Sequence, residues 1–154
     1  LVNVGNNFLA SNKNINKLYF IYLRQVGDNF LRCNEIIREI YMSQLEIIGN
    51  NFMYSNRQLL KADLSKVRLI ENNFLYKNNS VEILDLSSLE KVGHCFMKEN
   101  NSLLVLLASR LRIVGINFLC KNIVVEYVDL SMLEDYGRDM FRDNLDVKRR
   151  VLCI

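Results

Sequence analysis

The residues with the most obvious chemical potential are the single histidine and its cysteine neighbour. His94 is followed directly by Cys95, and Cys120 lies further along the chain. Imidazole nitrogen and thiolate sulfur are ligands that zinc prefers, and the same pair could serve as base and nucleophile. However, the spacing matches no zinc-binding template, and consecutive side chains usually point in different directions. We therefore expect neither a metal site nor a hydrolytic dyad here.

The cysteines do not predict a disulfide framework either. They are Cys33, Cys95, Cys120 and Cys153, and they form no Cys-x-x-Cys pair and no regular spacing. Disulfide-stabilised and zinc-binding domains space their cysteines regularly, so we expect free and mostly buried thiols in this protein. Free thiols favour a reducing compartment such as the cytosol, including a host cytosol if the protein is delivered there.

Carboxylates and glycines offer no better case for catalysis. Asp63, Asp85 and Asp129 each occur in an Asp-Leu-Ser tripeptide, which marks them as part of a repeated pattern rather than as a paired acid and base. Each of the six glycines stands alone, so no glycine-rich phosphate-binding loop is present. We expect a protein that is not an enzyme and that uses no catalytic residue, cofactor or metal.

The composition argues against two further classes of function. The chain has 154 residues, with 20 Lys and Arg against 17 Asp and Glu. The formal net charge of +3 is too small and too dispersed to predict a nucleic-acid-binding surface. Half of the residues are hydrophobic, but no apolar run is long enough to predict membrane insertion. The length suits a single domain over residues 1–154.

The elements that position these residues come from a 22-residue repeat. Successive glycines are separated by 22, 22, 44, 22 and 22 residues, and Glu71 occupies the skipped place. Units start at residues 4, 26, 48, 70, 92, 114 and 136, and the last unit is incomplete. We number the first residue of each unit as repeat position 1, which places the glycines at position 2. A fixed period of this length is typical of solenoid proteins.

Every unit repeats one pattern of apolar residues. Position 5 is phenylalanine in the six complete units, and positions 6, 12, 15, 17 and 20 are apolar. A unit this short cannot bury its own apolar side, so the units must stack and share a core. The apolar residues at positions 15 and 17 alternate with other residues, and this two-residue period predicts a short strand. The polar residues ahead of position 5, as in Asn50-Asn51-Phe52-Met53, predict a capped helical turn that points the phenylalanine inward. We therefore predict an α/β-type repeat solenoid with about seven coils, strands on one face and short helical turns on the other.

Two polar columns are expected to hold the coils in register. Position 9 is asparagine in every unit, and a buried amide there can satisfy backbone groups of its own coil and the next. Position 21 alternates between arginine and glutamate, which sets opposite charges beside each other in neighbouring coils. Each exposed pair contributes only about 0–1 kcal/mol, so this column argues for register more than for stability. The ladder asparagines are Asn12, Asn34, Asn56, Asn78, Asn100, Asn122 and Asn144; the charges are Arg24, Glu46, Arg68, Glu90, Arg112 and Glu134.

The glycine column leaves two explanations open. Position 2 could require a left-handed backbone, which would cost a non-glycine residue about 1–2 kcal/mol. Alternatively, neighbouring coils could approach too closely for a side chain. Glu71 at this position is compatible with strain in its unit under the first explanation.

These repeats resemble the leucine-rich repeat family, and most closely its bacterial BspA-like or Treponema-type branch. Segments such as Leu59-x-x-Ala62-x-Leu64-Ser65 and Ile48-Gly49-Asn50-Asn51-Phe52 match the scheme of that branch across residues 4–152. Three features depart from it. Each unit is one residue shorter, serine replaces the usual proline after the strand, and Phe-Leu and asparagine replace the small-aromatic pair and the closing cysteine.

The resemblance implies that the variable positions of the strand, on the concave face, bind a partner protein. Positions 14 and 16 carry tyrosines at one end and aliphatic residues with a tyrosine at the other, with carboxylates between them. Such anchors with charged neighbours are typical of protein interfaces. The expected face consists of Lys17, Tyr19, Glu39, Tyr41, Lys61, Asp63, Ile83, Asp85, Val105, Leu107, Tyr127 and Asp129.

The favoured function is a non-catalytic module that binds a protein of unknown identity, with a bacterial effector as one setting. The alternative is a structural or surface adhesin-type array that associates with itself, since uncapped solenoid ends can stack. Neither function involves nucleic acid or membrane insertion. The first unit carries the apolar segment Tyr19-Phe20-Ile21-Tyr22, and the chain begins at Leu1 without a methionine. We therefore expect a piece of a longer chain.

Overall fold

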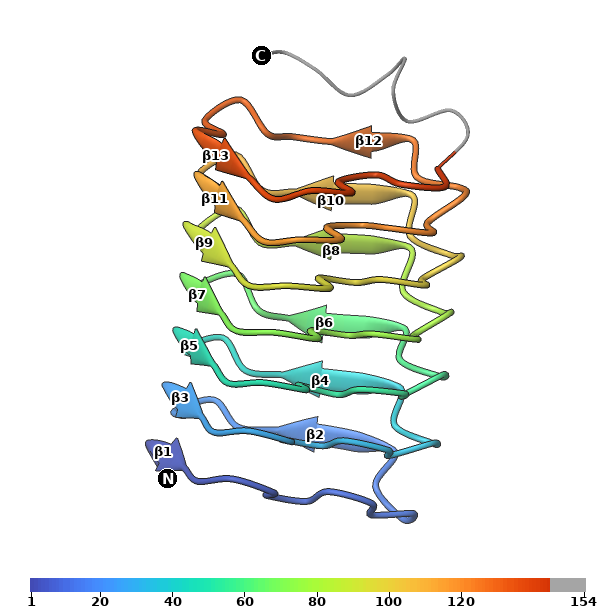
Figure 1. Ribbon diagram of the computed structural model, residues 1–154. Coiled ribbons are helices and arrows are strands. Elements are labelled where there is room, and N and C mark those ends of the chain that lie inside the picture. Colours follow the sequence, from blue (N-terminus) through green and yellow to red (C-terminus); the bar gives the residue numbers. More distant parts are fainter. Residues whose placement is uncertain (145–154) are drawn as a thin grey trace.

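The computed structural model describes residues 1–144 as a stack of coils built from short parallel strands (Figure 1). The odd-numbered strands are β1 (Asn3–Val4), β3 (Gln25–Val26), β5 (Ile47–Ile48), β7 (Leu69–Ile70), β9 (Lys91–Val92), β11 (Ile113–Val114) and β13 (Asp135–Tyr136). The even-numbered strands are β2 (Lys17–Tyr19), β4 (Glu39–Tyr41), β6 (Lys61–Asp63), β8 (Ile83–Asp85), β10 (Val105–Leu107) and β12 (Tyr127–Val128). No helix that could cross a membrane occurs within residues 1–144.

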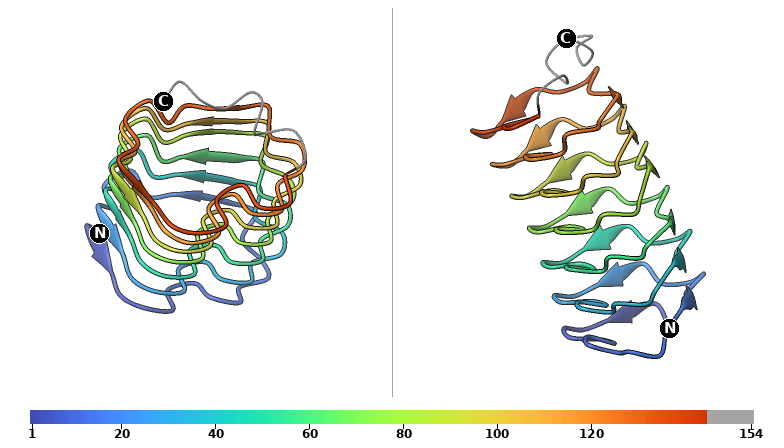
Figure 2. Two further views of the ribbon diagram at one scale, coloured as in Figure 1. Left: turned by 45° about the horizontal axis from the view of Figure 1, so that its top comes forward. Right: turned by 90° about the vertical axis from the view of Figure 1, so that its right-hand side faces the viewer.

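The strands form a parallel β-solenoid with the predicted period. The seven odd-numbered strands make one continuous sheet, in which each residue pairs with the residue 22 positions away, such as Ile48 with Ile70. The even-numbered strands form two sheets of three strands each, β2-β4-β6 and β8-β10-β12, with the same shift. Equivalent strands of successive coils lie one above another along the stack (Figures 1 and 2). The prediction of a 22-residue solenoid is therefore confirmed.

The prediction of helical turns on the second face is wrong. No residue from 1 to 144 is helical, and the continuous odd-numbered sheet, built from positions 22 and 1, runs along that side instead. Positions 4, 6 and 8 of every coil have positive φ, as in Asn51 (φ 57°), Met53 (φ 49°) and Ser55 (φ 59°). A helix would close its hydrogen bonds within the unit. Here the N–H groups of positions 4 and 8 point towards the following coil, and that of position 6 points towards the preceding coil.

Hydrogen bonds between coils offset the cost of the left-handed residues. The backbone N–H groups of Asn51 and Ser55 donate to Asn72 and Tyr76 of the following coil, at 2.8 and 2.9 Å. The N–H of Met53 donates to Phe30 of the preceding coil at 2.9 Å. A left-handed residue other than glycine or asparagine costs about 1–2 kcal/mol, so the segment depends on having a neighbouring coil on each side.

The core is a set of stacked rows, of which the phenylalanines at position 5 are the largest. Phe30, Phe52, Phe74, Phe96 and Phe118 are fully buried. Successive rings from Phe30 to Phe118 lie 5.1–5.6 Å apart between centroids and are within 12° of parallel. Burying a phenylalanine side chain contributes about 1.5–3 kcal/mol, so this row is a major part of the stability of each coil. The predicted inward direction of position 5 is confirmed.

The asparagine ladder at position 9 is present and buried. Asn34, Asn56, Asn78, Asn100 and Asn122 are at most 1% exposed, and each side-chain amide donates to the position-6 carbonyl of the preceding coil. For example, Nδ2 of Asn100 lies 2.8 Å from the carbonyl oxygen of Leu75. At the first coil, Asn12 is half-buried and its Oδ1 accepts from the backbone of Asn14 instead.

Two further polar columns, at positions 3 and 4, are absent from the sequence-based expectations. At position 3, a side-chain oxygen accepts from the backbone N–H of the next coil, as Asn6 does from Asp28 at 2.8 Å. At position 4, amides bond to one another, as Asn51 donates to Asn29 at 2.9 Å. Asparagine tolerates the left-handed backbone that position 4 requires. The residues interpreted as a helix cap therefore form ladders between coils.

The charge column at position 21 forms three separate ion pairs. They join Arg24 to Glu46 at 3.5 Å, Arg68 to Glu90 at 3.0 Å, and Arg112 to Glu134 at 2.6 Å. The predicted juxtaposition of opposite charges is confirmed. Within residues 1–144, each of these ion pairs joins two neighbouring coils, and no side chain takes part in two of them. Because all six side chains are exposed, each pair contributes little to stability.

Crowding explains the glycine column. None of the six glycines has a positive φ. A Cβ atom on Gly115 would lie 2.5 Å from the backbone carbon of Gly93, and one on Gly49 would lie 2.6 Å from that of Gly27. A Cβ on Gly5, which has no preceding coil beside it, would meet nothing within 4 Å. Glu71, whose side chain is exposed, is the one residue of this column that is not glycine.

Replacing Gly115 with alanine is therefore expected to destabilise the solenoid, by about 1–3 kcal/mol, because the two nearest atoms belong to the backbone of Gly93 and cannot turn aside. Gly5→Ala is the matched control, and its free energy of unfolding should stay within about 0.5 kcal/mol of the parent value. Urea unfolding followed by circular dichroism measures both. Equal effects of the two substitutions would contradict the crowding explanation.

Candidate partner-binding face

The even-numbered strands place the predicted partner-binding residues on one surface. Positions 14 and 16 point outward and are exposed or half-buried in all six coils, while position 15 between them points into the core. Eleven of the twelve predicted residues lie on strands β2 to β12, and Asp129 follows directly after β12. The alternation expected of a half-buried strand is therefore observed, and the twelve residues form a continuous row along the stack. We call this surface the even-strand face.

At the N-terminal end of the even-strand face, four side chains form a connected cluster. The rings of Tyr19 and Tyr41 stack with centroids 4.9 Å apart and planes 7° from parallel. The ammonium of Lys17 lies 5.4 and 5.2 Å from the two ring centroids and 2.7 Å from Oε2 of Glu39. The hydroxyl of Tyr41 donates to the same carboxylate at 2.7 Å. Each side chain thus restricts its neighbours, and the cluster presents an ordered aromatic surface.

The charges in this cluster shift one another's protonation. The hydrogen bond to Glu39 raises the pKa of Lys17 above its ordinary value. Hydrogen bonds from Lys17 and then from Tyr41 lower the pKa of Glu39, and the bond to Glu39 raises the pKa of Tyr41. All three directions favour the state in which Lys17 and Glu39 are charged and Tyr41 is neutral.

At the other end of the even-strand face, apolar side chains are exposed together. Ile83 is 64% exposed, Tyr127 48% and Leu107 36%, and Val105 between them is half-buried. Strand pairing places Val105 directly between Ile83 and Tyr127. Exposed aliphatic and aromatic residues that gather in one place are typical of protein-binding surfaces.

A break in strand pairing separates the two ends of this face. In the part of the chain that the structure describes, β6 and β8 do not pair, although the odd-numbered strands of the same coils do. Ala62 is the smallest residue of the position-15 row at this point, and the carboxylates of Asp63 and Asp85 occupy equivalent places on the two sides of the break. The coils are therefore joined less tightly here than elsewhere on this face.

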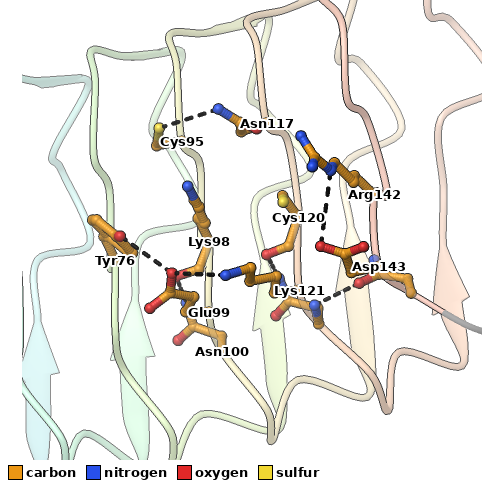
Figure 3. A network of polar contacts seen from close by, with 12 residues as sticks. Tyr76, Cys95, Lys98, Glu99, Asn100, Asn117, Cys120, Lys121, Arg142 and Asp143 are labelled. Carbon is orange, nitrogen blue, oxygen red and sulfur yellow. Dashed lines mark hydrogen bonds and ion pairs between the residues drawn. The ribbon is translucent and has the colours of Figure 1, made fainter.

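A second surface, which the sequence patterns do not reveal, is lined by residues at positions 8 and 10 of successive coils, and Figure 3 shows the polar contacts of Glu99 and Lys121 within it. It is an open groove of about 530 Å³, and we call it the corner groove. The hydroxyl of Tyr76 donates to Oε1 of Glu99 at 3.3 Å, and the ammonium of Lys121 lies 3.8 Å from the same oxygen. Burial and then the charge of Glu99 raise the pKa of Tyr76. The groove is lined by three cations, two carboxylates and three uncharged residues: Arg57, Lys77, Lys121, Glu99, Asp143, Asn79, Asn101 and Ile123.

The histidine takes part in a hydrogen bond between coils, and the three described cysteines are free thiols. The Nδ1 atom of His94 accepts a hydrogen bond from the backbone of Ile116 at 2.9 Å, in place of a position-3 asparagine. Cys33 and Cys95 are half-buried free thiols, and Cys120 is a buried one whose pKa is raised by its burial. Cys153 lies outside the described residues. Among residues 1–144, no three His, Cys, Asp or Glu side chains are grouped so that they could hold a metal ion.

Comparison with protein-family models, with curated proteins and with solved structures found no match to this chain. The likeness to leucine-rich repeats therefore rests on the repeated residues alone.

Proposed function

We propose that this solenoid is a non-catalytic interaction module that binds a partner protein through the even-strand face. The observation that supports it most strongly is the exposed apolar group of Ile83, Leu107 and Tyr127 on one surface of an otherwise regular scaffold. A partner would remove these side chains from water, and such burial provides the main driving force of most protein association. The ordered tyrosine pair at the other end provides a second anchor.

The dimensions of the face suit an interface of ordinary size. Six strands at a spacing of about 4.8 Å extend over roughly 24 Å, and a standard interface buries about 800 Å² on each partner. Aromatic side chains with few rotatable bonds lose little conformational entropy on binding, so the stacked pair of Tyr19 and Tyr41 is well suited to act as an anchor.

Substitution of the apolar end tests this function. We expect Leu107→Ser with Tyr127→Ser to weaken retention of a partner by at least about tenfold, because buried anchors carry most of the binding energy of an interface. The measurement is affinity capture from lysate with mass spectrometry, followed by titration of the retained protein. Ile47→Ser with Ile113→Ser is the matched control, since these residues are 38% and 39% exposed on the odd-numbered sheet.

The control variant should retain the same partner as the parent protein, and circular dichroism should show both variants folded. Equal retention by all three proteins would remove the even-strand face from the proposal. Capture of further copies of this chain alone, with association in sedimentation velocity, would instead favour the structural, self-associating array.

Membership of the leucine-rich repeat family, and of its BspA-like branch, is part of the same proposal. Its support is the repeated pattern itself: Leu-x-x-Leu-x-Leu spans each even-numbered strand, and Ile-Gly begins at the last residue of an odd-numbered strand. A role as an effector delivered into a host cytosol is consistent with three free thiols among the described residues.

A further inference from the structure

The lining of the corner groove carries three cations, Arg57, Lys77 and Lys121, against the two carboxylates of Glu99 and Asp143. Within residues 1–144, the side-chain nitrogens of Arg57, Lys77 and Lys98 have no carboxylate oxygen within 4.0 Å, whereas Lys121 is paired with Glu99. Arg57 and Lys77 line the groove, whereas Lys98 is at position 7, next in the chain to the lining residue Glu99 (Figure 3). Unpaired cations next to a concave surface produce a local positive potential, which attracts an anionic ligand.

Tyr76 holds two of these cations in place. The ammonium of Lys77 lies 5.3 Å from the centroid of the Tyr76 ring, and that of Lys98 lies 5.7 Å from it. A cation above an aromatic ring is attracted by the ring but keeps its N–H groups for other acceptors. Two flexible lysines are thus held beside the same ring before any ligand arrives, which reduces the entropy lost on binding. We propose that the corner groove binds an acidic peptide segment of a partner protein.

The aromatic rings in this region argue against a single-stranded nucleic acid as the ligand. Proteins that bind single-stranded nucleic acids stack the bases on open aromatic faces. Here the Tyr76 ring is approached by two ammonium groups, and the guanidinium of Arg32 lies 5.5 Å from the Tyr54 ring. Tyr54 and Tyr76 also meet edge-on, at 88°. These contacts leave little open ring surface for a base.

Three other lining residues suit a peptide. The carboxylate of Glu99, 30% exposed, would repel a polymer with a phosphate at every residue but leaves room for separated acidic side chains. Asn79 offers an amide to a peptide backbone, and Ile123 is 55% exposed and can contact an apolar side chain. The groove extends over four coil steps, or about 19 Å, which an extended peptide of about six residues spans.

Fluorescence anisotropy with a labelled peptide of alternating Glu and Leu, about six residues long, tests this proposal at low ionic strength. We expect Lys77→Gln with Lys98→Gln to weaken binding by about tenfold, equivalent to about 1.4 kcal/mol. Glu99→Gln, which keeps the contact with Tyr76 but removes a negative charge, should tighten binding by about threefold. Lys66→Gln with Lys91→Gln removes the same net charge from exposed sites elsewhere and should leave the affinity within about twofold.

Equal weakening by the two double substitutions would overturn the proposal, since binding would then depend only on net charge. Unchanged binding by Glu99→Gln would also overturn it, and this variant covers the case in which the double lysine variant does not fold. Tighter binding of a thymidine oligonucleotide than of the peptide would overturn the choice of partner class. The Leu107→Ser and Tyr127→Ser variant should bind the peptide normally, so failure of the even-strand face and failure of the corner groove are distinguishable.

Discussion

Replacing Asn100 with aspartate is expected to be among the most damaging single substitutions in this protein. Asn100 is fully buried, and its Nδ2 donates to the carbonyl oxygen of Leu75 at 2.8 Å. An ionised aspartate would remove this donor and place a negative charge against the carbonyl. Its oxygens would also lack donors, because Oδ1 of Asn100 accepts no hydrogen bond at present. Uncompensated buried charges cost about 3–5 kcal/mol, so we expect a loss of that size at pH 7.

The effect of Asn100→Asp should depend on pH in a defined direction. Burial disfavours the charged form, so the folded-state pKa of the new carboxyl lies above its unfolded value of about 3.9. Below that unfolded value the carboxyl is protonated in both states, and its O–H can donate to Leu75. The penalty therefore grows as the pH rises from about 4 towards the folded-state pKa.

Urea unfolding of parent and variant at pH 3.5 and pH 7 measures this difference, with ΔΔG smaller at the lower pH. Asn101→Asp is the matched control, because the same substitution is made at the next residue, which is exposed. It should change the free energy of unfolding by about 0.5 kcal/mol or less at either pH. A pH-independent loss at Asn100 would show that only the amide donor matters and would contradict the buried-charge argument.

The repeat and its core could be predicted from the sequence because they depend on residue type at fixed spacing. The inward direction of Phe52, the burial of Asn56 and the pairing of Arg68 with Glu90 all follow once identical units are stacked. The exposure of positions 14 and 16 follows from the two-residue period of a strand. Each of these predictions needs only the period and the polarity of one column.

The loop conformation was predicted wrongly because its hydrogen bonds join different coils. Asn50 and Asn51 are good helix-capping residues when the unit is considered alone. Stacking gives them a better alternative, in which Asn51 takes φ 57° and bonds to Asn29 of the preceding coil. The repetition of asparagine at position 4 was the available signal, since asparagine tolerates the left-handed backbone. The odd-numbered strands could not be predicted, because a strand of two residues is too short to show the two-residue period of apolar side chains.

The corner groove was beyond prediction from the sequence pattern for a different reason. Its residues come from variable positions in four or more coils, and they matter through distances rather than spacing. Lys77 and Lys98 are important because both approach the ring of Tyr76, which no periodicity reveals. The break between β6 and β8 is likewise a property of one coil interface, although Ala62 and the facing aspartates mark its place.

The break between β6 and β8 coincides with one member of the buried phenylalanine row, Phe74. Phe74 is fully buried, with Phe52 at 5.4 Å on one side and Phe96 at 5.1 Å on the other. Phe74→Ala should destabilise the protein by about 3–5 kcal/mol through lost burial and the cavity left behind. The stability of a solenoid depends on the contacts between neighbouring repeats, and cooperativity fails where one interface becomes too weak. Phe74 lies at the interface that already lacks pairing between β6 and β8.

We therefore expect Phe74→Ala to split urea unfolding into two transitions, each with a smaller m value than the single transition of the parent protein. Phe30→Ala is the matched control, because Phe30 is equally buried, stacks on Phe8 and Phe52 at 5.9 and 5.6 Å, and belongs to the coil whose strand β4 pairs with both β2 and β6. The control should lose a similar free energy but unfold in one transition with the parent m value. A single transition in both variants would show that the odd-numbered sheet and the asparagine ladders are enough to couple the coils across the break.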